Sequence, residues 1–597
     1  MIQNQKRLHW QYWLWLSLMV LPFCLTVEPL QAQLSHPTQL TQLPNPEPAN
    51  LSQPQNPLPR DEQPPSTAPL SEPEPPLPLP PPEQLLQPPA SPTPTPESTP
   101  ERGPTTIVVK QFNVTGSTVF SPEELAKVTA AFINRPLSLA ELFQARSAVT
   151  QLYIDQGYIT SGAYLPPQKL QGGVVEIRVV EGSLEEIQVT GTRRLNPNYV
   201  RSRIAIATQQ PLNRRRLLEA LQLLQLDPLI QTLSAELSAG SRPGTNLLEV
   251  QVTEADSFNT QVVLDNGRSP SVGSFRRRLQ VNEGNLLGQG DGFSIGYTNT
   301  DGSNALDVGY SFPLNPRNGT LSFNYGTTSS NVIEPPFNQL DITASSRYYE
   351  LTLRQPVIRT TTQELALGLI ASRRESEAAL LGGEIPFPAS GTDEQGRTRI
   401  SAVRFFQEWT QRNSQEVIAV RSQLSLGLNV LDATINPTAP DSRFVAWRGQ
   451  AQWVRLLAPD TLLLLRGDLQ LADRPLVALE QFGVGGQESV RGYRQDLLLS
   501  DNGAFASVEV RFPILRAPQV GGVLQLTPFV DLGTAWNNSS PNPSPTTLAS
   551  VGLGLRWQQG DRFTSRLDWG IPLVSTNSSG STLQESGLYF SVIYNPF

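Results

Sequence analysis

Arg491 and Asp531 are the two residues of this sequence with the most specific pairing chemistry. Arg491 lies in the stretch Gln487–Tyr493, directly after a glycine-rich segment, and Asp531 lies further along, in Phe529–Gly533. A guanidinium offers a planar fork of N–H donors that matches the two oxygens of a carboxylate. The chemistry expected here is therefore a bidentate ion pair that holds two segments together.

The segment around Asp531 alternates in hydropathy, and this alternation assigns its faces. One face carries Leu524, Leu526 and Val530, and the other carries Gln525, Thr527, Phe529 and Asp531. Successive side chains of a strand point to opposite faces, so Asp531 is expected to face the interior of a β-barrel. A lone carboxylate there is costly, so we expect the 487–493 loop to fold inward and Arg491 to pair with Asp531, with Gly492 permitting close backbone approach. Taken alone, the two residues fit two unrelated surface charges equally well.

Other chemistry is nearly excluded by residue content. The 597 residues include two histidines, His9 and His36, and one cysteine, Cys24, all near the N-terminus. We therefore predict no catalytic residue, no metal site and no cofactor. No Gly-x-x-x-x-Gly-Lys-Ser/Thr stretch occurs, so no ATP site is expected. The net charge of −8 gives no basic surface for nucleic acid.

The elements that position the pair are short alternating segments, which fill residues 255–597 without a helical pattern. Examples are Leu306–Phe312, Leu424–Val430, Val508–Phe512 and Val551–Trp557. A soluble sandwich alternates too, but the length of the region and an N-terminal export signal favour a transmembrane barrel. At about ten residues per spanning strand, sixteen antiparallel strands would use about half of the region.

The N-terminal part has two segments of different composition. Residues 1–32 carry Lys6 and Arg7 before an apolar run, as a secretory signal peptide does. Residues 33–105 hold most of the 54 prolines and are expected to form a disordered, semi-rigid linker. This linker is either a tether without a partner or a ligand for a proline-binding or cell-wall partner.

Two α+β units are predicted between the linker and the barrel, over residues 106–182 and 183–254. Each has the order β-α-α-β-β. In the first unit, a helix is expected from Ser138 to Gln156, and in the second from Asn213 to Leu226.

These units resemble POTRA domains, the periplasmic modules of outer-membrane protein transporters. The matching stretches are Gly157–Ile159, Glu176–Gly182, Ala220–Leu224, Asp227–Ile230 and Ala235–Leu237. An exposed sheet edge in such a domain can pair with an extended client strand. The alternative is that the units are only spacers.

The loop and the strand resemble the two signature motifs of the two-partner secretion transporter family of the hemolysin-activator type. Val490, Arg491, Gly492 and Tyr493 resemble the tip of the inward-folded outer loop, and Phe529, Asp531 and Gly533 resemble the wall motif that receives it. Asn285–Asp291 and Leu567–Pro572 also resemble family stretches.

This resemblance implies two POTRA domains, a sixteen-stranded barrel and the export of one secreted partner protein. It places the barrel in outer-membrane lipid and the POTRA domains in the periplasm, and we expect a monomer that binds no nucleic acid. Family members often carry an N-terminal plug helix, whereas Gln33–Leu43 is short and interrupted by Pro37. Pore closure is therefore expected to depend on the 487–493 loop alone.

The last segment of the chain resembles the terminal signal that the outer-membrane assembly machinery reads. Its residues are Gly587, Phe590, Val592 and the final Phe597. An ordinary last strand fits almost as well.

Two other functions remain open at this level. The first is an outer-membrane assembly insertase of the same superfamily, which shares the arginine and aspartate motifs. The second is a passive porin, which would need no periplasmic units and therefore leaves residues 107–254 unexplained.

Overall fold

The computed structural model describes residues 64–65, 68–69, 71–73, 85–87, 106–169, 172–387, 389–539, 541–576 and 580–596. The chain divides into two compact units, Met1–Pro54 and Gln55–Phe597, and every described residue belongs to the second. The predicted signal peptide, the plug-helix segment Gln33–Leu43 and Phe597 lie outside the described residues. Within the described ranges, the helices are all too short or too polar to cross a membrane.

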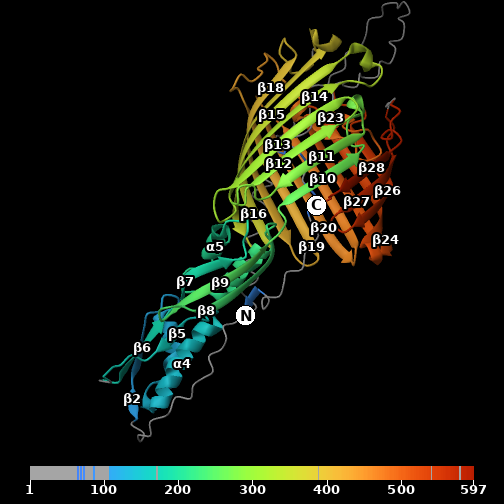
Figure 1. Ribbon diagram of the computed structural model, residues 1–597. Helices are drawn as coiled ribbons and strands as arrows, with labels where there is room; N and C mark the ends of the chain where they lie inside the picture. The colour runs from blue at the N-terminus through green and yellow to red at the C-terminus, as the bar shows by residue number, and fades with distance from the viewer. Residues whose placement is uncertain are drawn as a thin grey trace, which may run out of the picture. The chain divides into compact units, whose positions relative to one another are not determined.

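The first α+β unit begins at Ile107, and a three-stranded sheet with the order β3-β6-β5 lies against its helices (Figure 1). Strand β3 runs parallel to β6, and β5 runs antiparallel to it. The sequence pattern predicts a single first strand, but the chain bends at Lys110 and divides it in two. The first half, β2, pairs with β4, and the second half, β3, joins the sheet. The elements are β2 (Ile107–Val109), β3 (Gln111–Thr115), α3 (Pro122–Thr129), β4 (Arg135–Leu137), α4 (Leu139–Asp155), β5 (Gly162–Tyr164) and β6 (Val174–Val180).

One face of α4 forms the core of this unit. The buried residues recur at helical spacing and pack against alternate residues of β6, as an amphipathic helix on a sheet requires. They are Leu142, Ala145, Val149 and Tyr153 from the helix and Val175, Ile177 and Val179 from the strand. Both helices begin with a capping box, Ser121 with Glu124 and Ser138 with Glu141, which satisfies the first free N–H groups.

Glu141 makes the stability of the first unit pH-dependent. The hydrogen bond from the Ser138 backbone N–H, at 2.7 Å, and the ion pair with Arg135 lower the pKa of Glu141 from 4.5 to about 2. Because the folded pKa is depressed, the contribution of Glu141 is complete above about pH 4.5 and is lost as the pH falls towards 2.

We expect Glu141→Gln to remove much of this pH dependence from α4. The measurement is amide hydrogen exchange of α4 in the full chain at a pH between about 2 and 4.5 and again at neutral pH, compared between variant and wild type. The matched control is Glu123→Gln, at the exposed start of α3. Equal loss of protection on acidification in wild type and Glu141→Gln would contradict the assignment.

The second α+β unit repeats the layout of the first. Its elements are β7 (Ser183–Thr190), α5 (Pro197–Ala205), α6 (Arg214–Gln225), β8 (Ile230–Ala239) and β9 (Thr245–Glu254). Asn213, expected to be the first residue of this helix, instead caps α6 by accepting hydrogen bonds from the Arg215 and Arg216 N–H groups. The sheet has the order β1-β8-β9-β7, in which β1 (Leu86–Gln87) belongs to the proline-rich segment and pairs parallel with β8. Leu85 and Leu86 are buried in the core of this unit.

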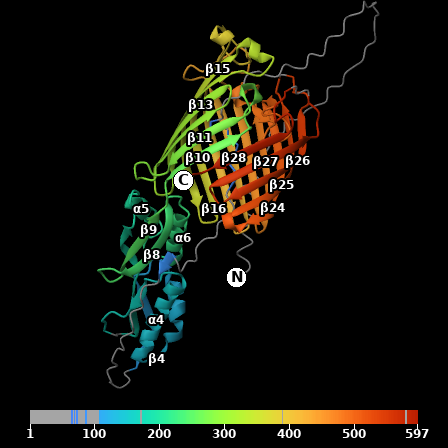
Figure 2. The same ribbon diagram turned by 45° about the vertical axis from the view of Figure 1, so that its right-hand side comes forward.

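The C-terminal region is a closed antiparallel barrel of sixteen long strands with one two-residue strand, β17, added beside β16 (Figures 1 and 2). The sixteen strands confirm the sequence prediction. The first and last strands close the barrel through Val262–Asp265 and Ser591–Tyr594.

The barrel strands are β10 (Phe258–Asp265), β11 (Arg276–Glu283), β12 (Gly292–Asn299), β13 (Ser303–Pro313), β14 (Thr320–Asn331), β15 (Thr343–Arg359), β16 (Gln363–Leu380), β17 (Ile385–Pro386), β18 (Arg397–Arg412), β19 (Glu416–Leu428), β20 (Val445–Ala458), β21 (Thr461–Ala472), β24 (Asn502–Ala517), β25 (Gly522–Trp536), β26 (Thr547–Gln559), β27 (Phe563–Pro572) and β28 (Leu588–Tyr594). The two strands β22 (Phe482–Val484) and β23 (Leu498–Ser500) form a separate hairpin between β21 and β24. Short 3-10 turns occupy Ala130–Phe132, Pro270–Val272, Phe337–Leu340, Leu381–Gly383, Ala478–Glu480 and Pro518–Val520.

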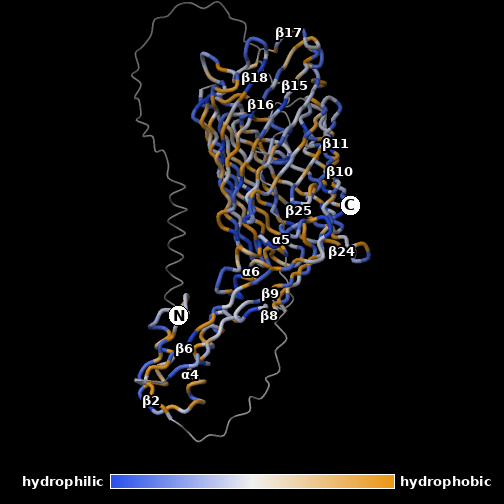
Figure 3. The backbone as a smooth tube through the Cα atoms, turned by 60° about the vertical axis from the view of Figure 1, so that its left-hand side comes forward, coloured by the Kyte–Doolittle hydropathy of each residue, from blue (hydrophilic) through white to orange (hydrophobic). Residues whose placement is uncertain are grey.

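Hydrophobic and hydrophilic residues alternate along the barrel strands (Figure 3). In β25, Phe529 and Asp531 are buried, whereas Val530 and Leu532 are more than half exposed. The exposed face of the wall is apolar in other strands too, for example at Leu353, Phe405, Leu426, Leu555 and Trp569. An apolar outer face around a polar interior is what a strand barrel in lipid needs.

Candidate functional site: a loop seated in the barrel

The segment between β21 and β24 carries the predicted arginine and lies against the inner wall of the barrel. Val490, Arg491 and Tyr493 are almost fully buried. The hydrophobic part of the loop packs with residues of β24, β25 and β26 in one cluster, which contains Phe482, Val484, Val490, Tyr493, Leu498, Phe505, Ala535 and Leu548. The loop is therefore a packed element of the lumen.

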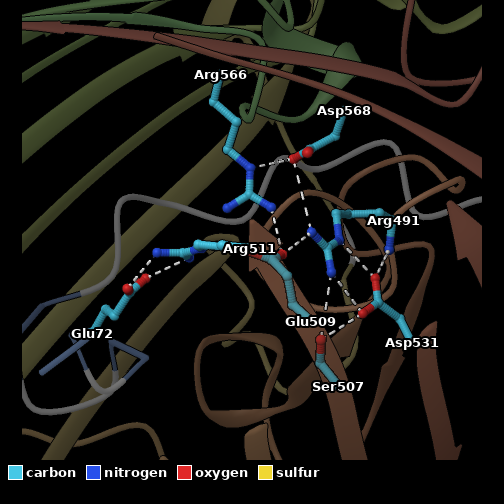
Figure 4. Close-up of polar contacts among 8 residues, drawn as sticks. All are labelled: Glu72, Arg491, Ser507, Glu509, Arg511, Asp531, Arg566 and Asp568. Atoms are coloured by element: carbon cyan, nitrogen blue, oxygen red, sulfur yellow. Dashed lines mark hydrogen bonds and ion pairs between the residues drawn. The ribbon is translucent and has the colours of Figure 1, made fainter. Parts of the chain in front are cut away.

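Arg491 and Asp531 make the bidentate contact that their residue types suggest (Figure 4). Arg491 Nε donates to Asp531 Oδ2 at 2.8 Å and Nη2 donates to Oδ1 at 2.9 Å. The Arg491 backbone N–H also donates to Oδ2, at 3.2 Å. Ser507 Oγ donates to Oδ1 at 2.6 Å, so both carboxylate oxygens are satisfied. The side chains of Arg491 and Asp531 are 1% and 0% exposed, so the pair is removed from solvent.

Two further carboxylates surround the same guanidinium. Arg491 Nη1 donates to Glu509 Oε2 at 2.7 Å and lies 3.8 Å from Asp568 Oδ2. Arg566 bridges these two carboxylates, donating to Asp568 at 2.6 Å and to Glu509 at 2.6 Å. Charges that are this deeply buried persist only when each one has partners, so the loop arginine completes a network built on the wall.

An aromatic ring covers the arginine. The Cζ atom of Arg491 lies 3.4 Å from the centroid of the Phe529 ring, in cation–π contact. Phe529 and Asp531 are on the same face of β25, which explains why both residues of the wall motif touch Arg491.

Glycines on the wall leave room for the loop backbone. A Cβ atom on Gly570 of β27 would lie 2.6 Å from the Gly492 N atom and 2.7 Å from the Arg491 C atom. Gly492 itself has φ +99°, which favours glycine. A Cβ on Gly533 would meet Val484 at 2.4 Å and Val490 at 2.8 Å. Gly533 and Gly570, both in the quoted motifs, are therefore contact points of the loop.

Tyrosines fix the loop to the last strands. Tyr493 Oη donates to the Ala549 carbonyl at 2.8 Å, and the Val574 N–H donates to Tyr493 Oη at 3.0 Å. Tyr589 of β28 accepts from the Gly492 N–H at 3.1 Å and donates to the Tyr493 carbonyl. The tip motif is thus hydrogen-bonded to the wall at each of its last three residues.

The base of the loop is anchored elsewhere in the barrel. Glu480 accepts from Arg404 of β18 at 2.7 Å and lies 3.2 Å from Arg374 of β16. Arg494 donates to both oxygens of Glu334, beyond the end of β14, at 3.0 and 2.7 Å. In the closed strand order, β19, β20, β21 and β24 separate β18 from β25. The loop therefore joins wall segments that do not neighbour each other.

The predicted terminal-signal residues lie at the seam of the barrel. Phe590 and Val592 belong to β28, and Val592 pairs with Leu264 of β10 and with Ser565 of β27. Gly587 has φ +73°, and a Cβ there would lie 2.1 Å from the Gly570 carbonyl. Phe597 lies outside the described residues.

Several residues of the site were missed in the sequence. Glu509, Arg511 and Arg566 belong to the polar halves of alternating segments, but alternation does not say which strands meet. The proline-rich segment has no periodic pattern from which a contact could be predicted. Glu72 pairs with Arg511 inside the barrel, and Leu86 and Gln87 pair with β8. These residues of the linker therefore contact the barrel and the second α+β unit.

The arrangement holds a loop against the barrel wall through ion pairs and hydrogen bonds. The carboxylates of the site, Glu509, Asp531 and Asp568, form ion pairs with arginines. Groups of three or more potential metal ligands do not occur within the described ranges.

Comparisons with known proteins agree with this architecture. The family model for the haemolysin secretion/activation protein ShlB/FhaC/HecB matches residues 244–557, and the model for the POTRA domain, ShlB-type, matches residues 107–182. The outer membrane transporter CdiB of Dickeya dadantii (strain 3937) is 25% identical over 468 residues, which cover 76% of this chain and 81% of that protein.

Two more relatives extend the comparison. The heme/hemopexin transporter protein HuxB of Haemophilus influenzae (strain ATCC 51907 / DSM 11121 / KW20 / Rd) is 21% identical over 476 residues, covering 76% of this chain and 80% of that protein. The solved structure of CdiB from Escherichia coli has the same fold, with a TM-score of 0.63 and 21% identity, over 84% of this chain and 93% of that chain. Because the first family model covers more than half of the sequence, this chain belongs to the haemolysin secretion/activation protein family ShlB/FhaC/HecB.

Proposed function

We propose that this chain exports a large, unfolded partner protein across the outer membrane through its barrel, after the partner has bound the α+β units. It is an outer-membrane transporter of the two-partner secretion type, with its POTRA region in the periplasm. The observation that carries this function is the joint match of residues 107–182 to a POTRA model and 244–557 to the secretion family. The curated relatives are named as transporters.

The α+β units bind the partner before it enters the barrel. We take the second unit as a second POTRA domain, because its sheet repeats that of the first. Strand β7 is parallel and β8 antiparallel to β9, as β3 is parallel and β5 antiparallel to β6. The partner would add an extended strand to an exposed sheet edge. Among the described strands, β3 and β5 end the sheet of the first unit, β7 ends that of the second, and β8 pairs with β1 on its outer side.

The loop residues act in export by keeping the loop on the barrel wall. Val490, Arg491, Gly492 and Tyr493 hold the lumen loop on its wall motif, Phe529, Asp531 and Gly533, and export requires this seating. Gly587, Phe590, Val592 and Phe597 form the signal through which the assembly machinery inserts the barrel into lipid. The chain acts as a monomer and uses no cofactor or nucleic acid.

Deletion of this chain from its native host tests the function. We expect one large β-rich protein to disappear from the culture medium, while the set of outer-membrane barrels stays unchanged. Complementation with the intact chain should restore secretion. Loss of many barrels from the outer membrane, with normal secretion, would instead support an assembly insertase and contradict the transporter.

Co-purification supplies an independent measurement. The tagged chain should capture the same secreted protein through its α+β units, and a variant that lacks residues 106–254 but keeps the barrel should not. Capture of many unrelated barrel proteins would again favour the insertase. A porin would capture neither class.

A further inference from the structure

A carboxylate from the proline-rich segment is bound to the inner wall of the barrel. Glu72 Oε1 accepts from Arg511 Nη1 at 2.6 Å and Oε2 accepts from Nη2 at 2.9 Å, although the two residues are far apart in sequence (Figure 4). A bidentate contact of this kind is the strong form of a charge-assisted hydrogen bond. Arg511 belongs to β24 and lies on the same face as Glu509 and Ser507.

The wall orients Arg511 in advance. Its Nε donates to Glu509 Oε1 at 2.7 Å, which leaves the two Nη atoms aimed away from Glu509. The other oxygen of Glu509 is occupied by Arg491 and Arg566. The Arg511 side chain is 4% exposed. A guanidinium held in this way loses little conformational freedom when it binds a carboxylate.

The loop and wall residues around this point carry one positive charge more than negative charge. The arginines are Arg491, Arg511, Arg556 and Arg566, and the carboxylates are Glu509, Asp531 and Asp568. Arg556 of β26 donates to two neutral partners, Gln525 and Gln558, and also attracts Glu72 electrostatically. Glu72 supplies the fourth carboxylate, and it does so from outside the wall.

The Glu72 side chain is more exposed than that of Arg511. It is 41% exposed, and Ser71 beside it is exposed as well. Both charges of the pair face a lumen through which another chain would pass. The structure thus combines a fixed receptor with a ligand that is open to exchange.

We propose that Arg511, oriented by Glu509 and assisted by Arg556, is a carboxylate-binding site of the barrel lumen. It holds Glu72 at rest and takes the acidic side chains of the exported polypeptide in its place during passage. The ligand class is an Asp or Glu side chain on an extended chain. This inference rests on the proposed function, because it needs a polypeptide in the lumen.

The ion preference of the purified full chain in a planar bilayer provides the first test. We expect Glu72→Gln to shift the reversal potential towards anions and Arg511→Gln to shift it towards cations, each at about 0.1 M salt and much less at about 1 M. The matched control for the arginine is Arg516→Gln, an exposed residue of β24 that pairs with Asp460. The control for the carboxylate is Glu74→Gln, which removes the same charge from the same stretch of sequence. Identical reversal potentials in all variants would overturn the proposal.

A peptide that blocks the pore tests exchange directly. The probe is a short unstructured peptide of Glu, Gly and Ser, and its counterpart carries Gln in place of Glu. With Glu72→Gln, the acidic peptide should block at a concentration about tenfold lower than with wild type, because it no longer competes with Glu72. The Glu72→Gln/Arg511→Gln double variant should lose this gain, and the Gln peptide should not distinguish the variants. Equal block by both peptides in wild type and Glu72→Gln would sink the site.

Folding and function are separated by two controls. Each variant is first checked for the heat-dependent gel shift of a folded barrel. If Arg511→Gln does not fold, Arg511→Lys replaces it. Lysine keeps the charge but loses the bidentate contact, so the gain in acidic block caused by Glu72→Gln should shrink in Glu72→Gln/Arg511→Lys. An undiminished gain would overturn the site. Failure of the proposed function would appear as unchanged secretion after deletion of the chain, whereas the peptide block would still report on Arg511. Normal export together with equal peptide block in all variants would rule out the carboxylate site and leave the transporter function standing.

Discussion

Arg491→Ala is expected to abolish export while the barrel still folds and inserts. The arginine has no part in the strand ladders, so closure of the wall does not depend on it. Its loss leaves Asp531 buried with the Ser507 hydroxyl but without its arginine, and leaves Glu509 with two arginines, Arg511 and Arg566, in place of three. Removing one partner of a buried ion pair costs about 3–5 kcal/mol. The loop then leaves its seat, because a seated loop would keep the Asp531 carboxylate buried without a counter-charge.

Export is measured as the amount of partner protein in the medium, and insertion as the heat-dependent gel shift of the barrel. Arg516→Ala is the matched control, since this exposed arginine pairs with Asp460 on the surface, where an ion pair is worth about 0–1 kcal/mol. Normal export by Arg491→Ala would refute the role of the loop. An exchange of charges, Arg491→Asp with Asp531→Arg, should recover part of the activity if direct pairing matters most.

Gly570→Ala is expected to impair export almost as strongly, without touching any charge. The added Cβ would lie 2.6 Å from the Gly492 N atom and 2.7 Å from the Arg491 C atom, both of them backbone atoms that cannot rotate away. The loop must therefore move outward by several tenths of an ångström, which breaks the close Arg491 geometry. The strand around Gly570 should stay intact, because its φ value suits other residues.

The matched control is Gly467→Ala on β21, where a Cβ would meet only the Phe505 carbonyl, at 3.8 Å. Limited proteolysis should cut the loop of Gly570→Ala faster than that of Gly467→Ala, in parallel with lower secretion. If both alanine variants export at the wild-type rate, the glycine is not a seat for the loop.

The sequence predicted much of the barrel because a membrane wall restricts residue choice at every second position. The parity of residues 524–531 placed Asp531 on the inner face without any coordinates, and the structure has the same parity. The helix over Ser138–Gln156 followed from apolar spacing in the same way, and α4 spans Leu139–Asp155. Both patterns are local, so a single strand or helix contains all the information they need.

The missed contacts are those that join distant strands. Glu509 and Arg566 belong to β24 and β27, and which residues face each other depends on the register of every strand between them. Glu72 was missed for a different reason. Its surroundings are rich in proline and poor in apolar residues, a composition typical of a spacer, and one ion pair leaves no periodic signal.

The two anchorages of the lumen loop have a mechanical consequence. Glu480 binds Arg404 and Arg374 on one part of the wall, and Arg491 binds Asp531 on another, so the loop acts as a strut across the cylinder. The easiest deformation of a hollow tube is ovalisation, in which one diameter lengthens as the other shortens. A strut that resists this change keeps the cross-section round and narrow. Widening of the barrel for a passing chain is then coupled to detachment of the loop at one of its two ends.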